Sequence, residues 1–548
     1  MNKITVNIDN NKNIVVASGT KYIDISKNSF YKDTVLGVKK NNQILSLNDV
    51  ALNDEAIEFF DINSIEGSKI YKAALKFILE VAIKTLYNEA DIEFLHSVPG
   101  GMLGEIKSNI KLTETDIAKI KAEMENIVKN DYPILKYNIL KKEAIHFYEE
   151  NNLLEKAKNV QVHDNIVTIY KLKNYLNYFY VNMPYSTGYI KSFDLKYLHD
   201  NRLIILYPSN LTGGILPTYT PHDNIVNAFY KGKSWLKMLK APFVSDLNNL
   251  VSNSSISGFI ESCELYFNDQ IKKVSEEIQK RENCRFIMLA GPSSSGKTTT
   301  SRVLGAYLRS KGYNPLCISI DDYFKERKDT PKDEFGNYDF ESLAAIDIDL
   351  LNKDLVALLK GEKINVPVFN FKTGEKEYHN NYLEMTDNSI VLIEGLHSLN
   401  EELTSYIPKV YKYKVYLSPF IPLNIDRHNY ISTLDLRLLR RIIRDNRTRG
   451  HSVKDTLHNW QNVRRGEEKY IFPFTNEADI IINTALPYEL GVLKVYAEPL
   501  LLSVDTDSSY YEEARRLLKF LHIFYSIPSE YVSKSSILRE FIGGNNND

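Results

Sequence analysis

Cysteine is scarce in this sequence. Its 548 residues include three cysteines, Cys263, Cys284 and Cys317, and no pair of them has CxxC spacing. Scattered cysteines supply neither a disulfide framework nor a cysteine-based zinc cluster. This usage indicates a protein of the reducing cytoplasm.

Long apolar runs are also missing. The sequence contains no stretch of 18 uncharged apolar residues, and it begins with the polar, alternating segment MNKITVNIDNN. These features predict no membrane span and no secretion signal. We therefore expect no membrane partner.

Neither sign of charge is in excess. The chain has 68 Lys and Arg against 70 Asp and Glu, so no global field draws it to nucleic acid or to an anionic membrane. Hydrophobic residues make up 43% and charged residues 25%, which excludes general disorder. Because the chain is too long for a single core, we expect several domains.

The N-terminal half predicts two small units. Short strands separated by Asn, Asp and Gly turns, with one helix near residues 21–30, predict a small mixed β module over 1–63. Apolar residues then recur at helical spacing from Ser68 to about Asn88. Helical runs over 112–158 and strand-like segments over 165–207 complete a predicted α+β domain, 64–240.

The C-terminal half predicts an α/β domain. A connecting helical segment, 241–283, leads into the apolar run 285–290. From there to about residue 500 strands and helices alternate, which predicts a parallel sheet with helices on both faces. Residues 501–548 are expected to form C-terminal helices and a disordered tail, GGNNND.

A phosphate-binding loop follows the apolar run at once. The segment from Gly291 to Thr298 has the GxxxxGK[ST] spacing, which a chain of this composition matches by accident with odds on the order of one in a hundred. Glycine lets backbone N–H groups approach phosphate oxygens, while Lys297 neutralises the β and γ phosphates and Thr298 ligates Mg²⁺. We predict ATP binding by the residues Gly291, Pro292, Ser293, Ser294, Ser295, Gly296, Lys297, Thr298 and Thr299.

Two later strands end in carboxylates. The run 316–320 delivers Asp321 and Asp322 at the strand end where open α/β sheets bind ligands, so Asp321 is a candidate catalytic base. The alternative for this pair alone is an ordinary polar strand cap. The strand from Ser389 places Glu394 after four apolar residues, the layout of an acidic residue that holds Mg²⁺.

An arginine-rich helix is predicted further on. It contains Arg437, Arg440, Arg441 and Arg444 within about two turns, interleaved with Leu and Ile that give it a buried side. Such guanidinium groups can converge on phosphates. We interpret the helix as a lid over the ATP phosphates, and a solvated charged face is the alternative.

In this order the motifs resemble the uridine kinase and phosphoribulokinase branch of P-loop kinases, over about 284–500. The matching segments are GPSSSGKTT, DDYF, YDF, VPVFNF, VLIEG, DLRLLRRIIRD and NEADIIIN. The resemblance implies that Asp321 accepts the proton of a ribose 5′-hydroxyl and that Asp339 binds the ribose hydroxyls. It also implies the remaining site residues, which are Phe369 and Arg437 at the acceptor, Lys297, Arg437, Arg440 and Arg444 at the phosphates, and Thr298 and Glu394 at Mg²⁺.

Two positions depart from that family pattern. The family tyrosine is Phe369 here, and the histidine that helps to hold the pyrimidine falls at Gly374. The resemblance therefore leaves the acceptor open. It is uridine, cytidine or a related nucleoside, or another small alcohol such as a sugar phosphate or a pantothenate-like molecule.

The N-terminal half resembles the front of threonyl-tRNA synthetase, with a TGS-type β-grasp module and a second additional, or editing, domain. The cues are KIYKAALKFILEVAIKTLY, DYPI and STGYIKSF. The family's metal ligands fall at Ala73, Phe77 and about Phe179 and Met183, so we expect neither zinc nor editing hydrolysis. We interpret this half as a regulatory, RNA-sensing or ligand-sensing module, with an oligomerisation or stabilising appendage as the alternative.

Together these features predict an ATP- and Mg²⁺-dependent kinase that phosphorylates the 5′-hydroxyl of a nucleoside and forms a homo-oligomer. A nucleotide-switched RNA-binding protein is a further alternative. The acceptor-site motifs favour turnover, because a switch needs no acceptor site.

Overall fold

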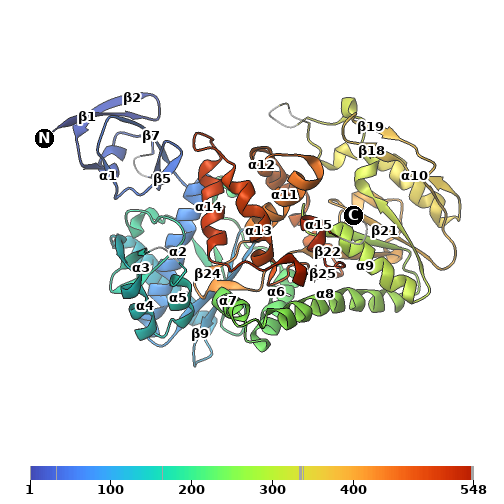
Figure 1. Cartoon of the computed structure of the whole chain (residues 1–548), viewed down its shortest axis with the longest axis horizontal. Helices are drawn as coiled ribbons and strands as arrows, with labels where there is room; N and C mark the ends of the chain where they lie inside the picture. The colour runs from blue at the N-terminus through green and yellow to red at the C-terminus, as the bar shows by residue number, and fades with distance from the viewer. Residues whose placement is uncertain (1, 32–33, 163–164, 333–335, 337, 545–548) are drawn as a thin grey trace.

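The computed structural model describes residues 2–31, 34–162, 165–332, 336 and 338–544. The N-terminal module lies at one end of the molecule and the large parallel sheet at the other (Figure 1). The last residues of the predicted tail, 545–548, lie outside the described residues. Within the described part of the chain no helix is long and apolar enough to cross a bilayer.

The N-terminal module is a mixed sheet closed by a short helix, α1 (Tyr22–Ser26). Its strand order is β2-β1-β7-β4-β5, in which β1 and β7 pair in parallel and the other neighbours are antiparallel. The strands are β1 (Lys3–Ile8), β2 (Lys12–Ala17), β4 (Gly37–Lys40), β5 (Gln43–Leu45) and β7 (Glu55–Phe60). Alternating residues such as Val6, Val38 and Ile57 are buried against Ile25, which explains the pairing of these strands with this helix.

The next unit is built around one buried helix, α2 (Ile65–Leu86), which begins at the N-cap Ser64. It packs on α3 (Glu114–Lys129) and on an antiparallel sheet of order β13-β14-β9-β8. The strands are β8 (Asp91–Val98), β9 (Gly101–Lys107), β13 (Asp194–Tyr197) and β14 (Arg202–Leu206). The β8–β9 hairpin lies in a stretch for which the sequence predicted no element.

A smaller sheet lies beside this unit. It has the order β10-β11-β12 and carries two helices on one side. The elements are β10 (Leu135–Leu140), α4 (Lys141–Glu150), α5 (Leu154–Val160), β11 (Ile166–Leu172) and β12 (Tyr175–Asn177).

The positions that correspond to the synthetase metal ligands belong to one hydrophobic core. Ala73, Phe77, Phe179 and Met183 are all buried in it, and the rings of Phe77 and Phe179 lie 5.5 Å apart. Apolar packing therefore occupies this place. The resemblance of the N-terminal half to threonyl-tRNA synthetase, and the domain boundaries drawn from it, stay predictions.

The C-terminal half contains the predicted parallel sheet, which is confirmed. Its order is β16-β21-β15-β22-β25, and each neighbouring pair runs parallel. The strands are β15 (Phe286–Ala290), β16 (Asn314–Ser319), β21 (Ser389–Gly395), β22 (Lys412–Ser418) and β25 (Ile480–Asn483). Because side chains alternate along a strand, Ile287 and Leu289 enter one core and Phe286 and Met288 enter the other.

Helices cover both faces of this sheet. One face is covered by α10 (Ile348–Leu359), whose Leu351, Leu355 and Leu358 are buried there. The other core contains α8 (Ile256–Gln279), α9 (Lys297–Ser310), α11 (Thr433–Arg449), α13 (Glu489–Leu502) and α14 (Tyr511–His522). Because the strands run parallel, their carboxyl ends lie at one edge of the sheet, where the following loops can meet.

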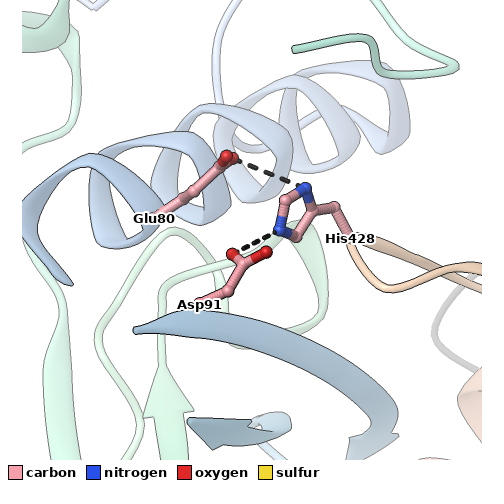
Figure 2. A group of neighbouring side chains, drawn as sticks. All are labelled: Glu80, Asp91 and His428. Atoms are coloured by element: carbon pink, nitrogen blue, oxygen red, sulfur yellow. Dashed lines mark hydrogen bonds and ion pairs between the residues drawn. The ribbon is translucent and has the colours of Figure 1, made fainter. Parts of the chain in front are cut away.

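A hairpin from the C-terminal half enters the N-terminal half. It consists of β23 (Asn424–Asp426) and β24 (Asn429–Tyr430) and contacts α2, α5 and β8. At its turn His428 lies between Asp91 and Glu80, with Nε2 3.0 Å from Asp91 and Nδ1 3.7 Å from Glu80 (Figure 2). Lys156 lies 2.8 Å from the same Nδ1.

These three side chains are also close enough together to suggest a metal site. The surrounding cations argue for an ion-pair network instead, because Arg427 lies 3.0 Å from Asp91 and Lys84 3.5 Å from Glu80. Asp91 and Glu80 therefore each have a cationic partner, as buried carboxylates require. The network joins the two halves of the molecule.

Candidate active site

The phosphate-binding loop connects β15 to α9. Gly296 is the N-cap of α9 and has φ 85, and Ser294 has φ 59, so the loop turns through left-handed backbone that favours glycine. At Gly291 a β-carbon would lie 2.7 Å from the carbonyl oxygen of Leu417. Both glycines are therefore required by backbone geometry. The Lys297 amine donates to the carbonyls of Gly291, at 2.9 Å, and of Pro292, at 3.3 Å.

Two oxygen-bearing side chains, predicted as ligands of a divalent cation, meet beside this loop. The Thr298 hydroxyl lies 3.3 Å from Glu394 Oε1, because β15 and β21 are paired and end together. Burial raises the pKa of Glu394, and the Lys297 charge opposes that rise. A hydroxyl and a carboxylate are hard donors of the kind Mg²⁺ prefers, so this pair fits the predicted cation.

Asp321 lies on the next strand end. It belongs to the short 3-10 turn Ile320–Tyr323 that follows β16, the strand paired with β21. Burial raises the pKa of Asp321, while Lys297 and Arg449 lower it, and its charge in turn raises the pKa of Glu394. Ser319, two residues before Asp321, pairs with Glu394 across the sheet, so the two carboxylates lie at the same strand edge.

The neighbouring Asp322 has a different role. Its Oδ1 accepts the backbone N–H of Phe369 at 3.3 Å, which fastens the turn to β18 (Val368–Asn370). Within the described residues the Asp321 carboxylate makes no hydrogen bond. Of the two candidates that the sequence placed together, Asp321 is the one available for chemistry.

Aromatic rings line the predicted acceptor region. The buried Phe369 ring lies 5.6 Å from Phe324 and 5.1 Å from Phe371, and 58% of Phe371 is exposed. Asp339 Oδ2 accepts the Tyr470 hydroxyl at 3.2 Å. Phe324 also lies 5.8 Å from Phe340, the residue after Asp339, so the aromatic cluster extends to the segment that carries this carboxylate. At Gly374, which has φ 79, a β-carbon would lie 2.8 Å from Arg327 Nε, so the arginine fills the space beside that glycine.

Glu341 is a further acidic group that the sequence analysis did not identify. Burial raises its pKa to about 7, with Glu467 and Asp321 adding to the rise and Arg441 and Lys297 opposing it. Its side chain packs on Gly466, in α12 (Val453–Tyr470). In the sequence it is marked only by its position two residues after Asp339. That position does not indicate how deeply its side chain is buried.

The arginine-rich helix is α11, and its first two arginines are buried. Arg437 is 1% and Arg440 is 0% exposed. Arg437 Nη1 lies 2.9 Å from Glu467, and Arg440 Nε lies 2.8 Å from Glu489. Arg437 Nε also donates to the Ser293 carbonyl at 2.9 Å, and Arg440 Nη1 to that of Ser294 at 3.3 Å.

In this arrangement Arg437 and Arg440 hold the carbonyls of the loop, while its amides are the groups that bind phosphate in such loops. Their predicted role as phosphate ligands stays a prediction. The next arginines are half-buried. Arg441 Nη1 lies 2.9 Å from the Ser293 hydroxyl, and Arg444 pairs with Asp445 at 2.8 Å. These two side chains are more exposed than those of Arg437 and Arg440, and Arg441 also contacts the loop.

The C-terminal helix α15 (Arg539–Ile542) also reaches the loop. Glu540 Oε2 accepts the Thr299 hydroxyl at 2.8 Å and the Thr299 N–H at 3.3 Å. Sequence reasoning assigned this segment to C-terminal helices and a tail. No local pattern marks a contact between residues so far apart in the chain.

Comparison with known proteins places relatives on this half of the chain. Residues 286–488 match the family described as Phosphoribulokinase / Uridine kinase family. A uridine kinase of Bacillus pumilus is 29% identical over 198 residues, which span 36% of this chain and 84% of that protein. A uridine kinase of Halobacterium salinarum is 28% identical over 198 residues, spanning 36% of this chain and 78% of that protein.

A solved structure titled as a possible uridine kinase of Bacillus stearothermophilus is also similar. It is 18% identical, and the match covers 39% of this chain and 98% of that chain with a TM-score of 0.28.

Proposed function

We propose, from the premise that residues 286–488 are a domain of the phosphoribulokinase/uridine kinase family, that this protein transfers the γ-phosphoryl group of ATP to the 5′-hydroxyl of a nucleoside. The observation that carries the proposal is the meeting of Lys297, the Thr298–Glu394 pair and Asp321 at one sheet edge. These are the groups that such a transfer needs.

The loop would bind the triphosphate. Its backbone N–H groups and the positive N-terminus of α9 attract the phosphate oxygens, and Lys297 moves from its own loop carbonyls to the β and γ phosphates. Mg²⁺ held by Thr298 and Glu394 would neutralise charge that develops on the transferred group. Arg441 and Arg444 of α11 supply further positive charge from the lid side.

Asp321 would act on the acceptor. A carboxylate orients the attacking hydroxyl and accepts its proton as the new oxygen–phosphorus bond forms. Since burial raises its pKa, Asp321 is a better proton acceptor than a solvated aspartate. The nearby Lys297 and Arg449 charges oppose that rise.

The acceptor region favours a nucleoside. The rings of Phe324, Phe369 and Phe371 offer a surface on which a flat base can stack, and Asp339 can accept hydrogen bonds from ribose hydroxyls. Another small alcohol is the second candidate, since Phe369 and Gly374 replace two residues of the family pattern.

The test is an assay of the full-length protein with ATP and Mg²⁺ against uridine, cytidine, adenosine and guanosine, with a sugar phosphate and pantothenate as further acceptors. We expect a nucleoside 5′-monophosphate and ADP in equal amounts, and Lys297→Ala should lower turnover at least about 100-fold. Product from the other alcohols alone would retain the kinase and reject the nucleoside. No phosphorylated product from any acceptor would reject the proposal.

A further inference from the structure

A C-terminal segment, residues 536–543, crosses the phosphate-binding loop. Ile537 packs so closely on Gly296 that a β-carbon there would lie 2.8 Å from Ile537 Cγ1. Arg447 of α11 donates to the carbonyls of Glu540, at 3.2 Å, and of Phe541, at 3.3 Å. The segment therefore contacts both the loop and the arginine-rich helix.

Within this segment the Glu540 carboxylate binds the start of α9. It accepts both the backbone N–H and the hydroxyl of Thr299, the third residue of that helix. The first N–H groups of a helix have no partner inside the helix. In a loop-and-helix phosphate site they are the donors that bind the anion.

Glu540 thus occupies donors that the phosphate chain of a nucleotide needs. Its negative charge also contributes to the raised pKa of Glu394, which places it within electrostatic reach of the predicted Mg²⁺ ligands. A nucleoside triphosphate brought to this loop would meet a like charge. The carboxylate and the phosphates exclude each other at Thr299.

The backbone of the segment is firmly held. The side chains of Ile537, Leu538 and Phe541 are fully buried, and Phe541 lies under the Arg440 guanidinium at 4.7 Å. Glu540 is an exception to this packing, since its carboxylate is directed at the loop. A change of its side-chain rotamer would release Thr299 without unfolding the segment.

We propose that Glu540 is an internal competitor for the phosphate chain of the nucleotide. It satisfies the start of α9 in the nucleotide-free protein and must leave when the nucleotide binds. This inference rests on the proposed function, because it needs a nucleotide at the loop. It predicts that wild type binds ATP more weakly than a protein without this carboxylate. The reason is that Glu540 occupies the Thr299 donors in a fraction of the molecules, which are then not ready to bind ATP.

The experiment is a calorimetric titration of full-length protein with ATP in magnesium buffer. Glu540→Gln and Glu540→Ala should lower the Kd for ATP about five- to thirtyfold, the effect of removing a carboxylate that competes for a helix terminus. The matched control is Glu530→Gln, an exposed glutamate in the same C-terminal region, which should leave the Kd unchanged. Lys297→Ala should weaken binding.

The outcomes separate the two proposals. Should neither wild type nor variants bind ATP, the proposed function fails. Should wild type bind ATP and Lys297→Ala weaken it, while the Glu540 variants bind equally or more weakly, the competitor is overturned and the proposed function stands.

A second measurement uses wild type alone: increasing Mg·ATP should protect the 297–300 amides from hydrogen exchange while leaving the buried 537–542 amides unchanged. Loss of protection at 537–542 would instead show that the whole segment moves when the nucleotide binds. That result would also overturn the proposal that only the Glu540 side chain is displaced.

Discussion

At the residue scale, neighbouring carboxylates differ in what their surroundings allow. Asp321 and Asp322 are adjacent in sequence, and burial raises the pKa of both. Asp322 accepts a hydrogen bond from the backbone N–H of Phe369, whereas Asp321 interacts electrostatically with Lys297. The structure therefore separates a positioning carboxylate from a candidate base.

We expect Asp321→Asn to lower kcat about 100- to 10,000-fold, because the amide cannot accept the acceptor's proton. The Kd for ATP should stay nearly unchanged. Steady-state kinetics and calorimetry on the same preparations measure both quantities. Asp322→Asn is the matched control and should retain most of kcat, since an amide oxygen can still accept the Phe369 N–H; comparable losses in the two variants would remove Asp321 from the role of base.

Glu341 predicts a pH-dependent stability. Its pKa is raised from 4.5 to about 7, so the folded protein binds a proton there that the unfolded chain has lost. The contribution of the protonated Glu341 to the free energy of unfolding is fully present below pH 4.5 and is lost as the pH rises through about 7. Repulsion by Glu467 and Asp321 is the physical reason that ionisation is resisted, in addition to burial.

Glu341→Gln should therefore match wild type below about pH 4.5 and exceed its free energy of unfolding by about 3 kcal/mol above pH 7. Denaturant titrations at a series of pH values measure this difference. Glu362→Gln, at an exposed glutamate, should show no such trend. A difference that does not vary with pH would contradict the shifted ionisation of Glu341.

At the element scale, α11 changes its environment along its length. Its N-terminal arginines, Arg437 and Arg440, are buried beneath the loop, and the later Arg441 and Arg444 are half-buried. Helical spacing places Arg437, Arg440 and Arg444 on one side of the helix. Burial, which periodicity does not specify, distinguishes the two buried arginines that bind the loop carbonyls from Arg441 and Arg444, which are partly exposed.

Arg440→Met should destabilise the protein by about 3–5 kcal/mol, because it leaves Glu489 buried without its cation. Thermal unfolding measures the loss, and the double variant Arg440→Met/Glu489→Met should recover much of it. Arg444→Met is the comparison on the same helix. It should cost under about 1 kcal/mol of stability while lowering turnover, and equal destabilisation by the two single variants would refute this division of α11.

At the scale of the whole molecule, the β23–β24 hairpin joins the two halves. Asp426 is fully buried and accepts the Tyr178 hydroxyl at 2.7 Å and the Asn429 side-chain amide at 2.9 Å. Lys156 lies 3.7 Å away. Only Ile431 separates the hairpin from Ser432, the N-cap of α11, so the joint between the halves leads into the arginine-rich helix.

We expect Asp426→Ala to destabilise the protein by about 3–5 kcal/mol, since it leaves Lys156 and several buried donors without their acceptor. Calorimetric unfolding should show the melting of the two halves becoming separate, with limited proteolysis near the hairpin increasing. Asp387→Ala, at an exposed position, is the control. An unchanged unfolding profile for Asp426→Ala would mean that the hairpin does not couple the halves.

Much of the fold and of the candidate site could be predicted from local patterns. The loop, the strand ends that carry Asp321 and Glu394, and the arginine-rich helix each show in a few consecutive residues, because phosphate binding and strand burial impose local spacing. The N-terminal strands could likewise be predicted from the turn residues that separate them. The β8–β9 hairpin was missed because β8 is buried throughout most of its length and shows little alternation.

The sequence by itself determined that this chain has a phosphate-binding loop and carboxylates at neighbouring strand ends, because those features depend on residues close together in the chain. The tertiary structure decided which arginines are buried, how deep Glu341 lies and that Glu540 meets Thr299. Such facts depend on the packing of segments up to hundreds of residues apart, and the partner that a side chain acquires there leaves no trace in its own neighbourhood of the sequence.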